Sequence, residues 1–88
     1  MKPWFVYMVE CADGTFYTGV TDDLNNRLAT HNAGRGAKYT KGRVPVVLRF
    51  KEELSGRGNS QKREAELKKL SRRAKINLCD KIPSIRKL

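Results

Sequence analysis

Five side chains in this 88-residue sequence have the types and spacing that could support chemistry. They are two tyrosines in neighbouring apolar segments, an arginine and a histidine one helical turn apart, and a later glutamate: Tyr7, Tyr17, Arg27, His31 and Glu64. The sequence has no cysteine and histidine cluster with the spacing of a metal site, no nucleophile elbow and no glycine-rich phosphate loop. Most classes of enzyme are therefore excluded.

The same five residues contain what hydrolysis of a phosphodiester requires. That reaction needs a cation on the phosphoryl oxygens, a group that orients or deprotonates water, and stabilisation of the departing oxyanion. Glu64 can hold Mg²⁺, because one carboxylate suffices for an ion that keeps most of its waters and takes a phosphate oxygen. Arg27 can brace a phosphate bidentately, and His31 can assist proton transfer or bind phosphate.

Each candidate also has an ordinary structural role open to it. Glu64 precedes Lys68 by four residues, so the two can form an exposed ion pair on a helix. Tyr7 and Tyr17 can be half-buried sheet residues, and His31 can be a hydrogen-bonded histidine on an apolar stripe. The residue types alone leave both interpretations open.

The charge of the chain predicts a polyanionic partner. The sequence has 19 Lys and Arg against 9 Asp and Glu, a net charge of +10, and a pI of about 10.1. Residues 57–88 hold 11 basic and 3 acidic side chains and so carry +8 of the total. A pI above about 9 is typical of nucleic-acid-binding domains, where Lys and Arg displace counterions from phosphates. We expect a nucleic acid as partner, DNA in preference to RNA.

Length and composition bound the organisation of the chain. Residues 1–88 have room for a single domain with one modest core. The two cysteines offer no disulfide framework, no apolar run approaches the roughly 18 residues of a membrane span, and the N-terminus lacks a signal-peptide layout. These features predict a cytoplasmic protein with no membrane association, as a monomer or a weak dimer.

Hydrophobic patterning predicts an α/β fold in the order β-β-α-β-α-α, with a three-stranded antiparallel sheet flanked by helices. Strands are expected at residues 3–11, 15–20 and 44–53, with Val46, Leu48 and Phe50 on one face of the third. A first helix, capped by Thr21, is expected to run to about residue 32. Residues 55–59 are expected to break the chain before a helix at 60–70. A last helix from Ser71 should end before Pro83.

The loop of the first hairpin decides where the two tyrosines point. A two-residue loop would place Tyr7 and Tyr17 on opposite faces of the ribbon. A three-residue loop, with Gly14 as the bulge residue at positive φ, pairs Cys11 with Thr15 and places both tyrosines on one face. Asp13 before Gly14 favours the three-residue loop.

The sequence resembles the GIY-YIG nuclease superfamily, and in particular its small stand-alone bacterial proteins. The likeness covers nearly the whole chain and lies in Phe5-Val6-Tyr7, Tyr17-Thr18-Gly19, the Arg27 to His31 helix, Gly34-Arg35-Gly36-Ala37-Lys38 and the Glu64 to Leu70 segment. Phe5-Val6 stands where the name-giving motif has Gly-Ile, and Thr18 stands where it has Ile. These differences affect packing more than mechanism.

The resemblance implies a metal-dependent endonuclease of low sequence specificity that acts on structured or damaged DNA. Tyr7, Tyr17, Arg27 and His31 would be catalytic, and Glu64 would hold a divalent metal, Mg²⁺ or alternatively Mn²⁺. One tyrosine would position or deprotonate the attacking water. Free tyrosine titrates near pH 10, so this role needs a cationic neighbour such as Arg27. The alternatives are a nucleic-acid-binding module with little or no turnover and an adaptor for an acidic protein.

Basic and aromatic residues near this site are expected to track a nucleic-acid backbone. Four lie in the long loop at residues 32–43 and one lies on the helix that carries Glu64: Lys38, Tyr39, Lys41, Arg43 and Lys68. Their ordinary interpretation is solvated surface charge. No segment has a recognisable motif for base edges, so no sequence specificity is expected.

Overall fold

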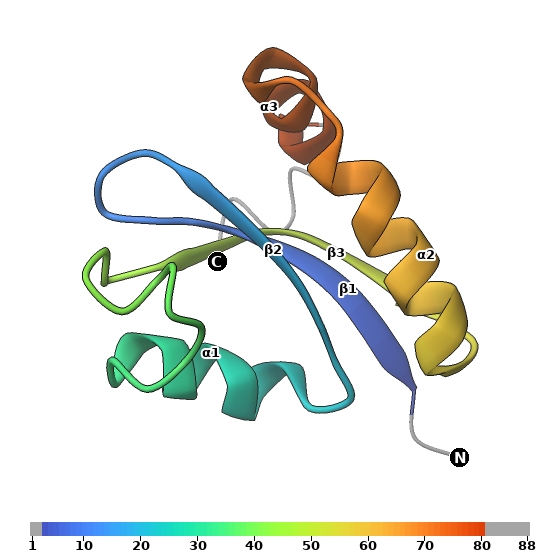
Figure 1. Cartoon of the computed structure of the whole chain (residues 1–88), viewed down its shortest axis with the longest axis horizontal. Helices are drawn as coiled ribbons and strands as arrows, with labels where there is room; N and C mark the ends of the chain where they lie inside the picture. The colour runs from blue at the N-terminus through green and yellow to red at the C-terminus, as the bar shows by residue number, and fades with distance from the viewer. Residues whose placement is uncertain (1–2, 81–88) are drawn as a thin grey trace.

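A central sheet with helices on both faces organises the chain (Figure 1). The structure is a computed structural model that describes residues 3–80, in the order β1 (Trp4–Glu10), β2 (Phe16–Thr21), α1 (Leu24–Asn32), β3 (Val47–Leu54), α2 (Gly56–Lys68) and α3 (Arg72–Asp80). The strands are antiparallel in the order β2-β1-β3, so β1 is central. The predicted fold class and element order are confirmed.

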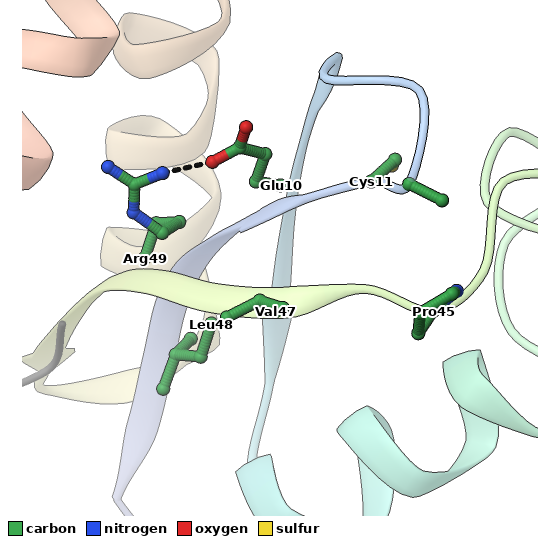
Figure 2. Close-up of a pocket in the computed structure, with 7 residues that line it drawn as sticks. Glu10, Cys11, Pro45, Val47, Leu48 and Arg49 are labelled. Atoms are coloured by element: carbon green, nitrogen blue, oxygen red, sulfur yellow. Dashed lines mark hydrogen bonds and ion pairs between the residues drawn. The ribbon is translucent and has the colours of Figure 1, made fainter. Parts of the chain in front are cut away.

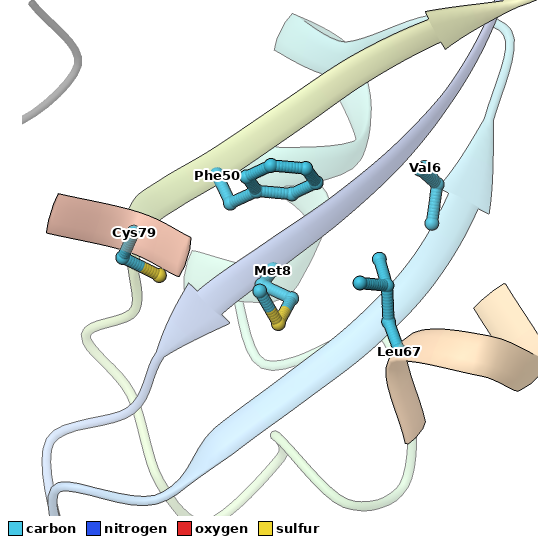
Figure 3. Packing of buried hydrophobic residues seen from close by; sticks show 5 residues of the cluster. All are labelled: Val6, Met8, Phe50, Leu67 and Cys79. Carbon is cyan, nitrogen blue, oxygen red and sulfur yellow. The ribbon is translucent and has the colours of Figure 1, made fainter. Parts of the chain in front are cut away.

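Strand β1 is buried on both faces, which explains its unbroken apolar sequence. One face packs against α2 and α3 through a cluster that Figure 3 shows: Val6, Met8, Phe50, Leu67 and Cys79. The other face packs against α1 and the segment before β3 through Tyr7, Val9, Cys11 and Val46, with Leu24 and Leu28 from α1 beside them. The sheet therefore separates two layers of buried side chains, one beneath α2 and α3 and the other beneath α1.

The first hairpin has the predicted three-residue loop. The Cys11 N–H donates to the Thr15 carbonyl at 2.7 Å, and Gly14 has a φ of +84°. The resulting register pairs Tyr7 with Gly19 and places Tyr17 opposite Val9. Tyr7 and Tyr17 consequently lie on the α1 face of the sheet.

The prediction that Leu48 and Phe50 share a face of β3 is wrong. Met8 pairs with Phe50 but Val9 pairs with Leu48, so Arg49 is an extra residue in β3. This β-bulge reverses the alternation, and Leu48 faces α1 whereas Phe50 faces α2 and α3.

Strand β3 also begins three residues later than predicted, at Val47. The side chain of Asn32 forms hydrogen bonds with both backbone groups of Val46: its Oδ1 accepts the Val46 N–H at 2.7 Å and its Nδ2 donates to the Val46 carbonyl at 3.3 Å. Asn32 thus replaces a neighbouring strand at this position.

The cap of α1 is Asp23 and not Thr21 as predicted. The Asp23 side chain accepts the Asn26 N–H at 3.2 Å, while Thr21 ends β2 and its hydroxyl accepts the Asp23 N–H at 3.0 Å. The strand therefore extends one residue further than expected, and the helix begins after it. The end of α1 near residue 32 is as predicted, with Gly34 at a φ of +77° after it.

The predicted break at residues 55–59 is wrong, because α2 begins at Gly56. Asn59 donates to the Ser55 carbonyl at 2.8 Å, and the Ser60 hydroxyl donates to the Gly56 carbonyl at 3.1 Å. These polar side chains support a first helical turn instead of ending it. Gly56 has a φ of +82°, a conformation that favours glycine.

Helix α3 begins at the predicted cap, since the Ser71 hydroxyl accepts the Ala74 N–H at 3.1 Å. The predicted stop before Pro83 lies outside the described residues. No helix within residues 3–80 has the length and apolar character that crossing a membrane requires.

Candidate active site

Four of the five predicted residues converge on the α1 face of the sheet. The ring centroids of Tyr7 and Tyr17 lie 6.5 Å apart, and the His31 ring lies 6.0 Å from Tyr7 and 5.3 Å from Tyr17. Arg27 projects from α1 one turn before His31. Hydrogen bonding to the Tyr7 hydroxyl raises the pKa of Arg27, so a permanent cation lies against the phenols.

Two glycines make room for the buried rings. A Cβ on Gly19 would lie 2.7 Å from Oη of Tyr7, its partner on β1. A Cβ on Gly36 would lie 2.3 Å from Nδ1 of His31. Real Cβ atoms do not approach other atoms this closely, so the absence of a side chain at these positions lets Tyr7 and His31 take their places.

A chain of hydrogen bonds with a defined direction passes through Tyr7 and His31. The Thr40 hydroxyl donates to the Ala37 carbonyl at 3.0 Å, which uses its only proton. Thr40 Oγ1 is therefore the acceptor in its 2.8 Å contact with His31 Nδ1. With its proton on Nδ1, His31 accepts the Tyr7 O–H on Nε2 at 2.8 Å. Thr40 in this way sets the tautomer of His31 and the direction of the Tyr7 proton.

Burial decides the protonation state of this pair. It lowers the pKa of His31 below its usual value, and the charge of Arg27 lowers it further. Burial also raises the pKa of Tyr7, and this effect outweighs the lowering by Arg27. Neutral His31 and protonated Tyr7 agree with the direction of the hydrogen bonds.

The two tyrosines differ in their access to solvent. Tyr7 and His31 are fully buried, whereas Tyr17 is half-buried. The Tyr17 ring stacks with Tyr39 at 6.1 Å between centroids and 25° between planes, and Tyr39 is 40% exposed. A substrate would therefore meet Tyr17 and Tyr39 before it met Tyr7.

Arg43 holds Tyr39 in this position. Its Cζ lies 4.2 Å from the centroid of the Tyr39 ring, and its Nη1 donates to the Tyr39 carbonyl at 2.6 Å. Its Nε also forms an ion pair with Asp13 at 2.9 Å. Lys38 and Lys41, from the same loop, are exposed. The structure thus gives Arg43 a contact inside the molecule and leaves the two lysines at the surface.

Glu64 lies on α2, which covers the opposite face of the sheet from Arg27 and His31. Its side chain is 22% exposed, and its Oε2 lies 3.4 Å from Nζ of Lys68, so the ordinary ion pair considered for it is present. Its charge also contributes to the raised pKa of Tyr7, after the larger effect of burial. The carboxylate is therefore within electrostatic reach of the tyrosine and histidine cluster.

The donor set at Glu64 fits a magnesium ion that is held mainly by water and substrate. No group of three or more His, Cys, Asp and Glu side chains within residues 3–80 could hold a metal ion together. Mg²⁺ sites in phosphoryl chemistry commonly use one or two carboxylates and keep several waters. Glu64 would be the protein ligand of such an ion.

A cavity of about 450 Å³ lies where the end of β1 meets the start of β3, and Figure 2 shows its lining. Glu10 and Arg49 form an ion pair there, so each neutralises the other. Burial raises the pKa of the Cys11 thiol, which stays protonated and is a poor nucleophile. The groups of this cavity are satisfied, and the tyrosine and histidine cluster remains the candidate site.

Sequence reasoning did not assign a role in the site to Thr40 or Gly36, and it gave Asp13 a role only in the hairpin turn. Thr40 looks like any loop threonine, because only the fold brings it to His31, nine residues away. Gly36 belongs to a segment used for the family resemblance, yet its contact with His31 depends on a turn after α1 that no residue pattern specifies. Asp13 has its role through Arg43, 30 residues later.

Comparison with known proteins adds to this geometry. A family model described as the GIY-YIG catalytic domain matches residues 3–77, which include all five candidate residues. The UPF0213 protein of Halobacterium salinarum is 53% identical over 70 residues, 80% of this chain and 91% of the relative. The UPF0213 protein of Staphylococcus haemolyticus is 46% identical over 80 residues, 91% of this chain and 98% of the relative.

Two solved structures are also similar. The solution NMR structure of the UPF0213 protein from Bacillus halodurans has a TM-score of 0.56 and 41% identity, and the match covers 89% of this chain and 83% of that chain. The solution NMR structure of an E. faecalis protein has a TM-score of 0.59 and 37% identity, with 89% and 84% covered.

Proposed function

The chain belongs to the family of GIY-YIG catalytic domains, and on that basis we propose that it is a metal-dependent endonuclease that hydrolyses phosphodiester bonds. Its substrate would be DNA in preference to RNA, cut with low sequence specificity at structured or damaged sites. The observation that carries the proposal is the directed hydrogen-bond chain from Tyr7 through His31 to Thr40, with Arg27 against it. A binding surface has no need of a buried phenol and imidazole in defined protonation states.

The geometry suggests separate roles for the two tyrosines. Tyr17 is the phenol that solvent reaches, so it would orient the attacking water. Tyr7 is buried and lies against Arg27, so it would hold the guanidinium toward the phosphate while its own O–H stays donated to His31 Nε2. Arg27 would brace the phosphate in the ground state and the transition state alike.

Glu64 would hold the metal, Mg²⁺ or alternatively Mn²⁺. A bound divalent cation supplies neutralisation of the charge that develops on the phosphoryl oxygens. Lys68 orients the Glu64 carboxylate in the absence of substrate and would exchange this contact for a phosphate. Lys38, Tyr39 and Lys41 would lie along the nucleic-acid backbone.

The remaining parts of the proposal concern the state of the protein. We expect residues 1–88 to act as a single domain, as a monomer or a weak dimer, in the cytoplasm. The net charge of +10 supports nucleic acid as the partner through counterion release.

Nicking of supercoiled plasmid tests the activity. Wild type with Mg²⁺ or Mn²⁺ should convert plasmid to the nicked form, and Glu64→Gln should abolish this because the metal loses its charged ligand. Glu66→Gln is the matched control: it lies on the same helix and pairs with Arg63 at 2.9 Å, so cleavage should persist. Affinity for DNA should stay level in both variants. Equal cleavage by wild type and Glu64→Gln would contradict the proposed role of the carboxylate.

One observation favours a second candidate, a nucleic-acid-binding module with little or no turnover. Glu64 already has a partner in Lys68, as a carboxylate with only a structural role would. Such a module would bind plasmid, branched and single-stranded substrates without any metal-stimulated nicking. The same purified protein, assayed for binding and for nicking, therefore separates the two functions.

A further inference from the structure

A second cavity, of about 250 Å³, lies at the hairpin end of the sheet, between β2 and the start of α3. Two cations, two aromatic rings and a threonine line it: Thr15, Phe16, Tyr39, Arg72 and Lys75. β2 is an edge strand, so the cavity opens at the rim of the sheet. It is smaller than the usual site for a drug-sized ligand and suits a single charged group with a small apolar neighbour.

Arg72 is held in place before any ligand binds. Its Nη1 donates to the Gly14 carbonyl at the hairpin turn, and its Cζ lies 5.5 Å from the centroid of the Phe16 ring. These contacts fix the guanidinium without neutralising its charge. A positioned guanidinium with N–H groups to spare favours a planar or tetrahedral oxyanion.

The positive charge of the cavity is uncompensated within residues 3–80. Neither Arg72 nor Lys75 forms an ion pair with a carboxylate there. The nearby acid at the hairpin turn is Asp13, which already accepts hydrogen bonds from Thr15 and forms an ion pair with Arg43. An anion that enters the cavity therefore meets two cations and an acid that is already neutralised.

Tyr39 connects this cavity with the candidate active site. It lines the cavity and also stacks with Tyr17, 6.1 Å away between centroids. A chain of phosphates that passes Tyr17 would cross Tyr39 and reach Arg72 and Lys75 next. The aromatic walls match the apolar side of a sugar, which inorganic phosphate lacks.

We propose that this cavity is a subsite for a backbone phosphate of the bound nucleic-acid strand, held by Arg72 and Lys75 with its sugar against Phe16 and Tyr39. The identity of the ligand rests on the proposed function, which makes nucleic acid the substrate. The subsite would set the path of the strand beyond Tyr17.

Binding of a fluorescent oligonucleotide in EDTA tests the subsite without any cleavage. The double variant Arg72→Gln/Lys75→Gln should lose about tenfold in affinity, and its log-log salt slope should fall by about one unit, the contribution of one phosphate. Lys69→Gln/Arg73→Gln is the matched control, because it removes the same charge from adjacent exposed positions outside the cavity. The control should lose less than about threefold. Equal losses in the two double variants would overturn the proposal.

Amide chemical shifts locate the contact and identify the source of the phosphate. The oligonucleotide should shift the backbone amide resonances of Thr15 and Phe16 in wild type. These shifts should vanish in the Arg72→Gln/Lys75→Gln variant, whose other resonances should stay at their wild-type positions. Inorganic phosphate alone should shift them only weakly. Saturation by inorganic phosphate as readily as by oligonucleotide would overturn the assignment to a nucleic-acid strand.

Failure of the subsite and failure of the proposed enzyme have different signatures. If the wild type never nicks plasmid but Arg72→Gln/Lys75→Gln binds the oligonucleotide selectively more weakly, the subsite is supported and the nuclease is refuted. Nicking that depends on Glu64, together with equal losses in the two double variants, refutes the subsite alone.

Discussion

The hydroxyl of Tyr7 lies against the α-carbon of Gly19, its cross-strand partner, so closely that a Cβ there would be 2.7 Å from Oη and 2.8 Å from Cζ. The same Cβ would lie 3.1 Å from Cε2 of Tyr17. The glycine of the Tyr17-Thr18-Gly19 segment therefore makes space for both phenols. Because φ at Gly19 is not positive, this role is one of size and not of backbone conformation.

Gly19→Ala should disturb the site through this contact. We expect a loss of about 1–3 kcal/mol in the free energy of unfolding, typical of overpacking a tight interior, and loss of the Tyr7 to His31 hydrogen bond. Plasmid nicking should fall by at least about tenfold. Urea denaturation and the His31 imidazole resonances measure the two effects. Gly58→Ala is the control: Gly58 lies inside α2 with open space around it, so that variant should be about 0.5–1 kcal/mol more stable.

Thr40→Val should release the tautomer of His31. The isosteric side chain leaves His31 Nδ1–H without its acceptor in a fully buried position, at a cost of about 1–3 kcal/mol in stability. The ¹⁵N spectrum of wild type should show the proton on Nδ1, and that of the variant should show a mixture of tautomers. Thr40→Ser should restore the wild-type spectrum. Thr30→Val, which removes an exposed hydroxyl on α1, should leave the ¹⁵N spectrum unchanged. A wild-type spectrum in Thr40→Val would contradict the direction assigned to the hydrogen-bond chain.

Local chemistry in the sequence was enough to predict the sheet and the face on which the tyrosines lie. Asp13 before Gly14 favoured the three-residue loop, and this loop alone fixes the register that brings Tyr7 and Tyr17 together. The apolar run of β1 similarly indicated a strand covered on both faces. These features depend on residues close together in the chain.

The parts that the sequence did not reveal depend on distant partners. The bulge at Arg49 reverses the faces of Leu48 and Phe50, and it is visible only in the pairing with β1, some 40 residues away. Alternating apolar residues gave no sign of it, because each face of this sheet has a core to receive them. The start of β3 likewise depends on Asn32, whose side chain accepts a hydrogen bond from the backbone N–H of Val46.

His31 predicts how stability depends on pH. Its pKa in the folded state is lowered by burial and by Arg27, so the unfolded chain binds its proton first as the pH falls. Stability should be full above about pH 6.5, the ordinary histidine value, and should fall below it until the lowered folded pKa is reached. The slope should approach 1.4 kcal/mol per pH unit at most.

His31→Gln checks this assignment by chemical denaturation between about pH 5 and pH 8. His31 is the only histidine in the sequence, and carboxylates titrate mainly below this range. The variant should be less stable at pH 8, yet its stability should hardly change with pH. An equally steep dependence in the variant would assign the effect to other groups.

Thr18 provides a test on the other face of the sheet. Its Oγ1 is buried and has no hydrogen-bond partner within the described part of the chain, in a position opposite Met8. An unpaired buried hydroxyl costs free energy, so Thr18→Val should raise the free energy of unfolding by about 1 kcal/mol. Valine has the shape of threonine, so neither Tyr17 on the opposite face nor Glu64 on α2 should move, and plasmid nicking should stay at the wild-type level. Thr21→Val is the control, because the Thr21 hydroxyl accepts the Asp23 N–H at 3.0 Å and its loss should be destabilising. Destabilisation by Thr18→Val, measured in the same urea titration, would mean that the Thr18 hydroxyl has a partner after all.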